Sequence, residues 1–125
     1  MSVIEKSIKS RGSKGEAEKP ALFDSGASYS CIRKELAEKL GIVEALPDAR
    51  RFGTAEKDHV IKGTHRITLD FHINGDRFSD EFMVIEALSD EVIIGAATLQ
   101  KWRMKLDFEN DEVVYDPRVT NLRLL

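Results

Sequence analysis

Cysteine and long apolar runs are scarce in this sequence. Its 125 residues include a single cysteine, Cys31, and no apolar stretch of the length that a bilayer requires. One cysteine excludes an internal disulfide, and the lack of a long apolar run excludes a membrane span and a signal-peptide core. We therefore expect no membrane association and a reducing, cytoplasmic setting.

The sequence also has no excess of basic over acidic residues. Lys and Arg total 19 against 22 for Asp and Glu, which gives a net charge of −3. The two signs are interspersed, whereas nucleic-acid binding needs a basic patch or stripe. We therefore expect no nucleic-acid partner. With 42% hydrophobic residues, the chain fits one domain over residues 1–125 with an ordinary core.

Most of the local patterns favour β-strands. The first two strands are separated by the loop sequence RGSKG and are expected to form a hairpin. Alternating apolar residues lead up to Asn74-Gly75, a dipeptide typical of a type I′ hairpin turn, and another hairpin is expected to turn at Asn110-Asp111. Strands are predicted at residues 2–10, 21–23, 67–73, 78–84 and 92–94, and a hairpin over 105–117.

One substantial helix is predicted over residues 30–40. Ile32, Leu36 and Leu40 recur every four residues, Ser30 can serve as the N-cap, and Gly41 can end the helix. A second, short helix is predicted over residues 97–102. The sequence predicts two helices and a larger number of strands, so the expected fold class is mostly β.

The stretch from residue 46 to residue 66 fits two structures. It contains Pro47, Gly53 and Gly63, with a polar centre at residues 55–59. A loop and a mobile β-hairpin are both compatible with this composition.

An aspartate follows the apolar run at residues 21–23, in the sequence LFDSGASYS. Burying a carboxylate is costly unless something pairs with it, so Asp24 needs an explanation. The small residues Ser25, Gly26 and Ala27 follow it, and they permit close approach of another backbone.

These residues carry a resemblance to a known family. The strand before Asp24-Ser25-Gly26-Ala27 and the later run Ile93-Ile94-Gly95 resemble the retroviral-type, or retropepsin-like, aspartic proteases and their cellular and bacterial relatives. In that family, the first motif carries the catalytic carboxylate and the second supports the same loop from below. The resemblance extends from roughly residue 2 to residue 115.

The resemblance implies a closed barrel of short strands with one main and one short helix, acting as a homodimer without metal or organic cofactor. Two carboxyls that share one proton can activate water for hydrolysis of a peptide bond. This chain has one Asp-Ser-Gly sequence, so Asp24 of a second copy would complete the pair across a twofold axis. Ser25 would hydrogen-bond across that axis, and Gly26 would allow the tight turn.

The resemblance also implies an extended peptide or protein substrate and a flap at residues 53–63 that closes over it. The family usually has glycine at the flap tip, where this chain has charged residues, and retroviral enzymes have an arginine in place of Ala96. The tail at residues 118–125 could pair between subunits. Substrate contacts are expected from Ala27, Ser28, Ala55, Glu56, Lys57, Ile93 and Ile94.

Other interpretations stay open beside the aspartic endopeptidase. Asp24 could merely cap a turn, and the domain could be a catalytically silent dimerisation or peptide-binding module. His59, His65 and His72 show no ligand spacing with Cys31, so no metal site is expected. Cys31 is interpreted as a small buried residue, because no histidine is identifiable as its base.

Overall fold

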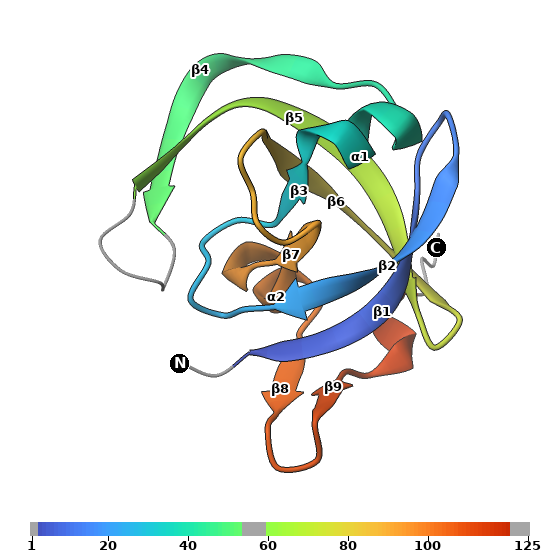
Figure 1. The fold of residues 1–125 in the computed structure, drawn as a ribbon. Coiled ribbons are helices and arrows are strands. Elements are labelled where there is room, and N and C mark those ends of the chain that lie inside the picture. Colours follow the sequence, from blue (N-terminus) through green and yellow to red (C-terminus); the bar gives the residue numbers. More distant parts are fainter. Residues whose placement is uncertain (1–2, 54–59, 121–125) are drawn as a thin grey trace, which may run out of the picture.

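A closed sheet forms the body of the protein, with strands of three to 14 residues (Figure 1). The computed structural model describes residues 3–53 and 60–120. The elements are β1 (Ile4–Arg11), β2 (Glu16–Phe23), β3 (Cys31–Arg33), α1 (Lys34–Leu40), β4 (Glu44–Gly53), β5 (Val60–Ile73), β6 (Asp76–Ile85), β7 (Val92–Ile94), α2 (Ala96–Lys101), β8 (Lys105–Asp107), β9 (Glu112–Val114) and the 3₁₀ helix η1 (Pro117–Thr120).

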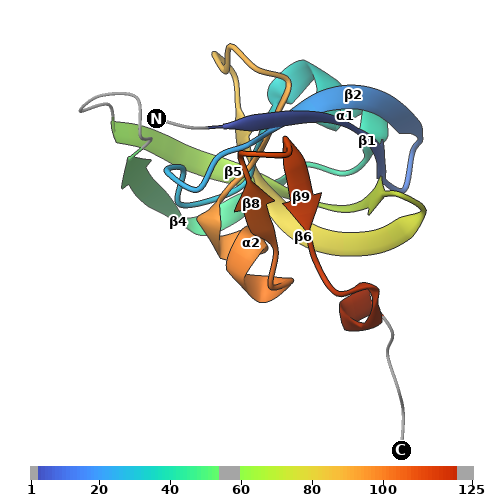
Figure 2. The same cartoon turned by 90° about the horizontal axis from the view of Figure 1, so that it is seen from below.

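The strand order explains the closure. The main sheet runs β1-β2-β7-β3-β6-β5-β4, and an additional pairing between β1 and β5 joins the sheet into a barrel. The β8–β9 hairpin forms a separate two-stranded sheet beside α2 (Figure 2). The mostly β, closed architecture with one main and one short α-helix is therefore confirmed.

The predicted hairpins are confirmed as well. β1 pairs with β2 from Ile4 opposite Phe23 to the end of both strands. Asn74 and Gly75 have φ values of 51° and 83°, as the two central positions of a type I′ turn require. Asp111, in the β8–β9 turn, also has a positive φ, of 53°.

Alternation along β5 fills the barrel. Ile67, Leu69 and Phe71 are each at most 1% exposed, because every second side chain of a strand points to the same face. The Phe71 ring stacks on Phe78 at 5.3 Å and meets Phe82 edge-on at 6.0 Å. Burying one such side chain contributes about 1.5–3 kcal/mol, so these rings are a main source of stability.

A second, smaller apolar cluster lies beside the main core. We call it the site cluster, because one of its members, Ala27, belongs to the loop that follows β2. Its buried members are Ala27, Cys31, Leu46, Phe52, Met83 and Ile93.

The first helix begins later than predicted. Residues 31–33 form β3, and α1 starts at Lys34. Ile32 lies between Val84 of β6 and Val92 of β7, so pairing on both sides overrides its helical spacing. Ser30 is consequently not the N-cap. The predicted C-terminal end at Gly41 is confirmed, since its N–H donates to the Ala37 carbonyl.

Residues 46–66, which are predicted to form a loop or a mobile β-hairpin, are extended before residue 54 and after residue 59. β4 and β5 pair antiparallel, with Phe52 opposite Ile61. Residues 54–59, the tip of the expected flap, lie outside the described residues, as do residues 121–125 of the tail. The described part of the tail is η1 and not a strand. Over the described ranges, no helix has the length and apolar character needed to cross a membrane.

Candidate active site

Asp24 lies directly after β2, at the start of the loop that leads to β3. Its backbone N–H donates to the Ile94 carbonyl at 2.9 Å, and its Oδ1 accepts the Gly26 N–H at 2.9 Å. The residue is 7% exposed. Among the described residues, its carboxylate has no other hydrogen bond and takes part in no ion pair. One oxygen is therefore fixed by backbone, and the other is left for a further partner.

Most of the residues directly after Asp24 are exposed to solvent. Ser25, Gly26 and Ser28 are exposed, whereas Ala27 is buried. The Ala27 N–H donates to the Asp24 carbonyl at 3.1 Å, which tightens the turn. Ser25, the residue that follows Asp24, is thus exposed at the protein surface.

The second sequence motif supports this loop from below, as expected. β7 lies between β2 and β3, parallel to β2 and antiparallel to β3. Phe23 is opposite Ile94, and Cys31 is opposite Ile93. The two strands that the Asp24 loop connects are therefore held apart by the VII sequence, and the loop must arch over its end.

Backbone contacts then clamp the loop to the start of α2. The N–H of Ala96 donates to the Ala27 carbonyl at 2.7 Å, and that of Ala97 to the Ser28 carbonyl at 3.1 Å. A Cβ on Gly95 would lie 2.5 Å from the Tyr29 carbonyl oxygen. Only glycine leaves room for this approach. These contacts hold the loop at Ala96, where retroviral enzymes have an arginine.

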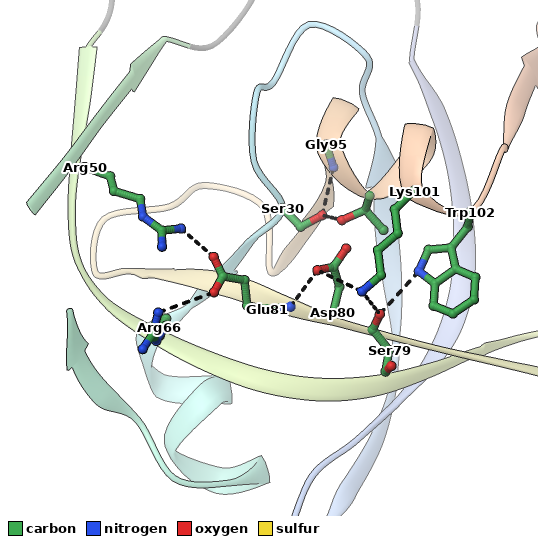
Figure 3. A network of polar contacts seen from close by, with 10 residues as sticks. Ser30, Arg50, Arg66, Ser79, Asp80, Glu81, Gly95, Lys101 and Trp102 are labelled. Carbon is green, nitrogen blue, oxygen red and sulfur yellow. Dashed lines mark hydrogen bonds and ion pairs between the residues drawn. The ribbon is translucent and has the colours of Figure 1, made fainter. Parts of the chain in front are cut away.

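A buried hydroxyl pair adds a side-chain link that sequence analysis missed. Ser30 Oγ lies 2.6 Å from Thr98 Oγ1 and accepts the Gly95 N–H at 3.0 Å (Figure 3). Each of the two residues is 1% exposed. Ser30 had a plausible local role as a helix cap, and nothing in the sequence relates it to Thr98.

The residues expected to contact substrate fall into four groups. Ser28 is exposed, and Ala27 and Ile93 belong to the site cluster. Ile94 is fully buried in the main core, so it supports the loop and has no free surface. Ala55, Glu56 and Lys57 lie outside the described residues.

Tyr29 is a further site residue that the sequence did not single out. Its ring meets Phe52 of β4 edge-on at 5.2 Å, and the Arg50 guanidinium lies 5.7 Å from the ring centroid. Arg50 pairs with Glu81 of β6, which also pairs with Arg66 of β5 at 3.6 Å (Figure 3). The hydrogen bond that Arg50 donates to the Glu81 carboxylate raises the pKa of Arg50. The loop is thereby connected to the strand that enters the expected flap.

Two other chemistries fit the site poorly. Within residues 3–53 and 60–120, no three His, Cys, Asp or Glu side chains are grouped to hold a metal ion; His59 is outside these ranges. Cys31 is 1% exposed, and burial raises the pKa of its thiol to about 12. A thiol that stays protonated is a poor nucleophile, so Cys31 is a structural residue, as expected.

Two solved structures are among those that this chain resembles. The retroviral protease-like domain of Ddi1 from Leishmania major matches with a TM-score of 0.68 and 23% identity, over 93% of this chain and 90% of that one. A retropepsin-like aspartic protease from Rickettsia conorii matches with a TM-score of 0.47 and 22% identity, over 86% and 89%. No curated protein matches.

The likeness to the Ddi1 domain shows a retropepsin-like fold. The family model described as gag-polyprotein putative aspartyl protease matches residues 13–101, which include Asp24, β7 and α2. This is more than half of the sequence. The chain therefore belongs to the family of gag-polyprotein putative aspartyl proteases.

Proposed function

We propose that the protein is an aspartic endopeptidase that acts as a homodimer and uses Asp24 of each copy as its catalytic pair. The observation that carries this proposal is the setting of Asp24. Its carboxylate is fixed by the Gly26 N–H alone among the described residues, at the start of a loop that β7 and α2 hold rigidly. A turn-capping aspartate makes the same bond, and the catalytic interpretation is favoured by the second carboxylate oxygen, which has no hydrogen-bond partner among the described residues.

The chemistry requires a second carboxyl. Two carboxyls about 3 Å apart cannot both ionise, so they hold one proton between them. The ionised member takes a proton from water while the protonated member donates to the carbonyl oxygen of the peptide bond. A twofold axis beside Asp24 supplies the second group, because an isologous contact brings the same residue of both copies together. No metal or organic cofactor takes part.

Ser25 and Gly26 then have separate tasks. The exposed Ser25 hydroxyl donates a hydrogen bond to the loop of the other copy and keeps the two carboxyls in register. The Gly26 N–H orients the carboxylate through its bond to Oδ1. Both act by fixing the position of Asp24, and position decides whether one proton is shared.

The substrate is an extended peptide that lies along the loop. Ala27 and Ser28 begin the wall of the binding groove, and the buried site cluster, which includes Ile93, supports that wall from the interior. Strands β4 and β5 carry the flap, whose residues Ala55, Glu56 and Lys57 we propose to contact the peptide with strand-like hydrogen bonds. The lone, buried cysteine is compatible with the cytoplasmic location that we also propose.

Digestion of a peptide library tests this function. We expect cleavage between about pH 4 and 6, where a carboxyl pair holds one proton, and loss of cleavage to background in Asp24→Asn, because an amide cannot exchange the proton. The asparagine oxygen can still accept the Gly26 N–H, so the variant should stay folded. Asp48→Asn is the matched control, since Asp48 is exposed on β4. A verified dimer that cleaves nothing in this range would contradict the proposal and favour a peptide-binding module.

A further inference from the structure

Strand β4 is attached unevenly to the barrel. Its register with β5 shifts between Ala45 and Arg50, where residues 46–49 of β4 face Thr64 alone. β4 is also an end strand in the order of the main sheet. Its second half, which leads to the proposed flap, is therefore held by the short ladder of residues 50–53 and by contacts of its side chains.

A chain of ion pairs bridges this irregular part of β4. Before it, Glu44 accepts a hydrogen bond from Arg66 of β5 at 2.8 Å. Arg66 also pairs with Glu81 of β6 at 3.6 Å, and Glu81 pairs with Arg50, which follows the irregular part. Figure 3 shows the guanidinium groups of Arg50 and Arg66 directed at the same carboxylate. Because β6 belongs to the barrel wall, these pairs fix Arg50 relative to the barrel.

The ring of Tyr29 connects Arg50 to the Asp24 loop. The Arg50 guanidinium lies 5.7 Å from the ring centroid, within the range of a cation–π contact. Phe52 meets the same ring edge-on at 5.2 Å. The backbone of Tyr29 is confined too, since a Cβ on Gly95 would lie 2.5 Å from its carbonyl oxygen. The end of the loop is thus held by β4 through the ring and by the start of α2 through the backbone.

We propose that Arg50 is a positioning residue for the catalytic pair, which acts through the Tyr29 ring to hold the Asp24 loop in the geometry for proton sharing. This inference rests on the proposed function. Two carboxyls share a proton when they are about 3 Å apart, and a displacement of about 1 Å can cost about a hundredfold in rate. Arg50 itself takes no part in the proton transfer.

A role of Arg50 in the flap alone would have a different kinetic signature. β4 leads to the proposed flap, so a loosened strand would weaken substrate binding, raise KM and leave kcat unchanged. A displaced Asp24 lowers kcat, because only the transition state requires the correctly placed proton. A purely structural role would change the melting temperature and neither constant. The split between kcat and KM therefore separates these roles.

Steady-state kinetics on a peptide taken from the library digest tests the proposal. We expect Arg50→Ala and Tyr29→Leu each to lower kcat by about tenfold, with KM changed by less than about twofold. Tyr29→Phe keeps the ring and should retain the wild-type kcat. Arg50→Lys keeps the charge without the planar group and should give an intermediate value. A raised KM with a wild-type kcat in both disruptive variants would overturn the proposal.

Two controls accompany these variants. Arg118→Ala is the matched substitution, because it also removes an arginine from an ion pair, here the exposed pair with Asp116, and it should leave both constants unchanged. Circular dichroism checks that each variant is folded. Should Arg50→Ala fail to fold, Tyr29→Leu and Arg50→Lys carry the comparison, since each removes the stacked contact and leaves a side chain at both positions.

Amide hydrogen exchange measures the effect on the loop without a substrate. The Ala27 N–H donates to the Asp24 carbonyl, and the Ala96 N–H donates to the Ala27 carbonyl, so both report opening of the loop. Arg50→Ala should speed up the exchange of these two amides by about fivefold and leave the amides of the β5–β6 ladder unchanged. Equal acceleration in the loop and the ladder would indicate a global loss of stability and overturn the proposal.

The two experiments distinguish this inference from the proposed function. Faster exchange confined to the loop, with a wild type that cleaves no peptide, supports the hold of Arg50 on the loop and contradicts the endopeptidase. Cleavage by the wild type, with kcat and loop exchange unchanged in Arg50→Ala and Tyr29→Leu, overturns the inference and supports the function. A lowered kcat without faster loop exchange also overturns the inference, because the effect would then not pass through the loop.

Discussion

Ser30 Oγ and Thr98 Oγ1 lie 2.6 Å apart, although 68 positions separate them in the chain. This hydroxyl pair ties the Asp24 loop to α2, and Ser30 also accepts the Gly95 N–H. Both side chains are buried, so water cannot replace the bonds when one partner is removed. The position of the candidate catalytic carboxylate therefore depends on a helix that follows it by some seventy residues.

Ser30→Ala should lower the free energy of unfolding by about 1–3 kcal/mol, because it leaves the Gly95 N–H and the Thr98 hydroxyl without a partner. Thr98→Val should cost less, since Ser30 still accepts the Gly95 N–H. Chemical denaturation measures both changes. Ser89→Ala, at an exposed serine, is the control, and a loss as large as that of Ser30→Ala would contradict the interpretation.

Gly95→Ala should destabilise the protein by about 1–3 kcal/mol or more through overpacking. The new Cβ would meet the carbonyl oxygens of Tyr29 and Ala27 at 2.5 and 2.8 Å, and both belong to the Asp24 loop. Thermal unfolding reports the loss. Gly15→Ala provides the comparison, because its nearest neighbour would be 3.5 Å away; similar melting temperatures for the two variants would refute the steric argument.

Cys31 should make stability fall at alkaline pH. Burial raises the pKa of its thiol in the folded state from 9.0 to about 12. Between pH 9 and pH 12 the thiol therefore loses its proton only in the unfolded chain. The contribution of the protonated thiol to folding stability is complete below pH 9 and is lost as the pH rises toward 12. The free energy of unfolding, measured against pH for the wild type and Cys31→Ala, isolates this effect.

The wild type must be compared with Cys31→Ala because the pKa of Tyr115 is also raised to about 12, by burial and by the nearby Asp76. Cys31→Ala keeps that contribution and removes only the thiol. The difference in unfolding free energy between the proteins should therefore be constant below pH 9 and shrink above it. If this difference in unfolding free energy stays constant up to pH 10, the buried thiol does not cause the loss of stability at alkaline pH.

The Arg50–Glu81 pair should show a coupling energy of about 1 kcal/mol, above that of an ordinary surface pair. Its side chains are 33% and 35% exposed, whereas those of Arg118 and Asp116 are 87% and 46% exposed. Double-mutant cycles with alanine measure the coupling energy of Arg50 with Glu81 and that of Arg118 with Asp116. Such a cycle reports the interaction of the two mutated residues alone, so the contact of Glu81 with Arg66 does not contribute. Equal couplings, equally weakened by salt, would show that the network adds nothing beyond surface pairing.

The sequence by itself determined the features that depend on neighbouring residues. The turn at Asn74-Gly75 needs two residues that tolerate positive φ, and the alternation along residues 67–73 has a single buried face. The turn and the alternation are local, because backbone preferences and side-chain periodicity act over a few residues. The Asp24-Ser25-Gly26 motif and the later Ile-Ile-Gly identified the loop and its support through their resemblance to a known family.

Tertiary structure alone decided the rest. Residues 31–33 have the spacing of a helix but form β3, because Ile32 gains strand partners on both sides. The Ser30–Thr98 bond and the contact of Arg50 with Tyr29 join residues from distant segments. Such contacts depend on which segments the closed sheet brings together, and no local pattern encodes that choice.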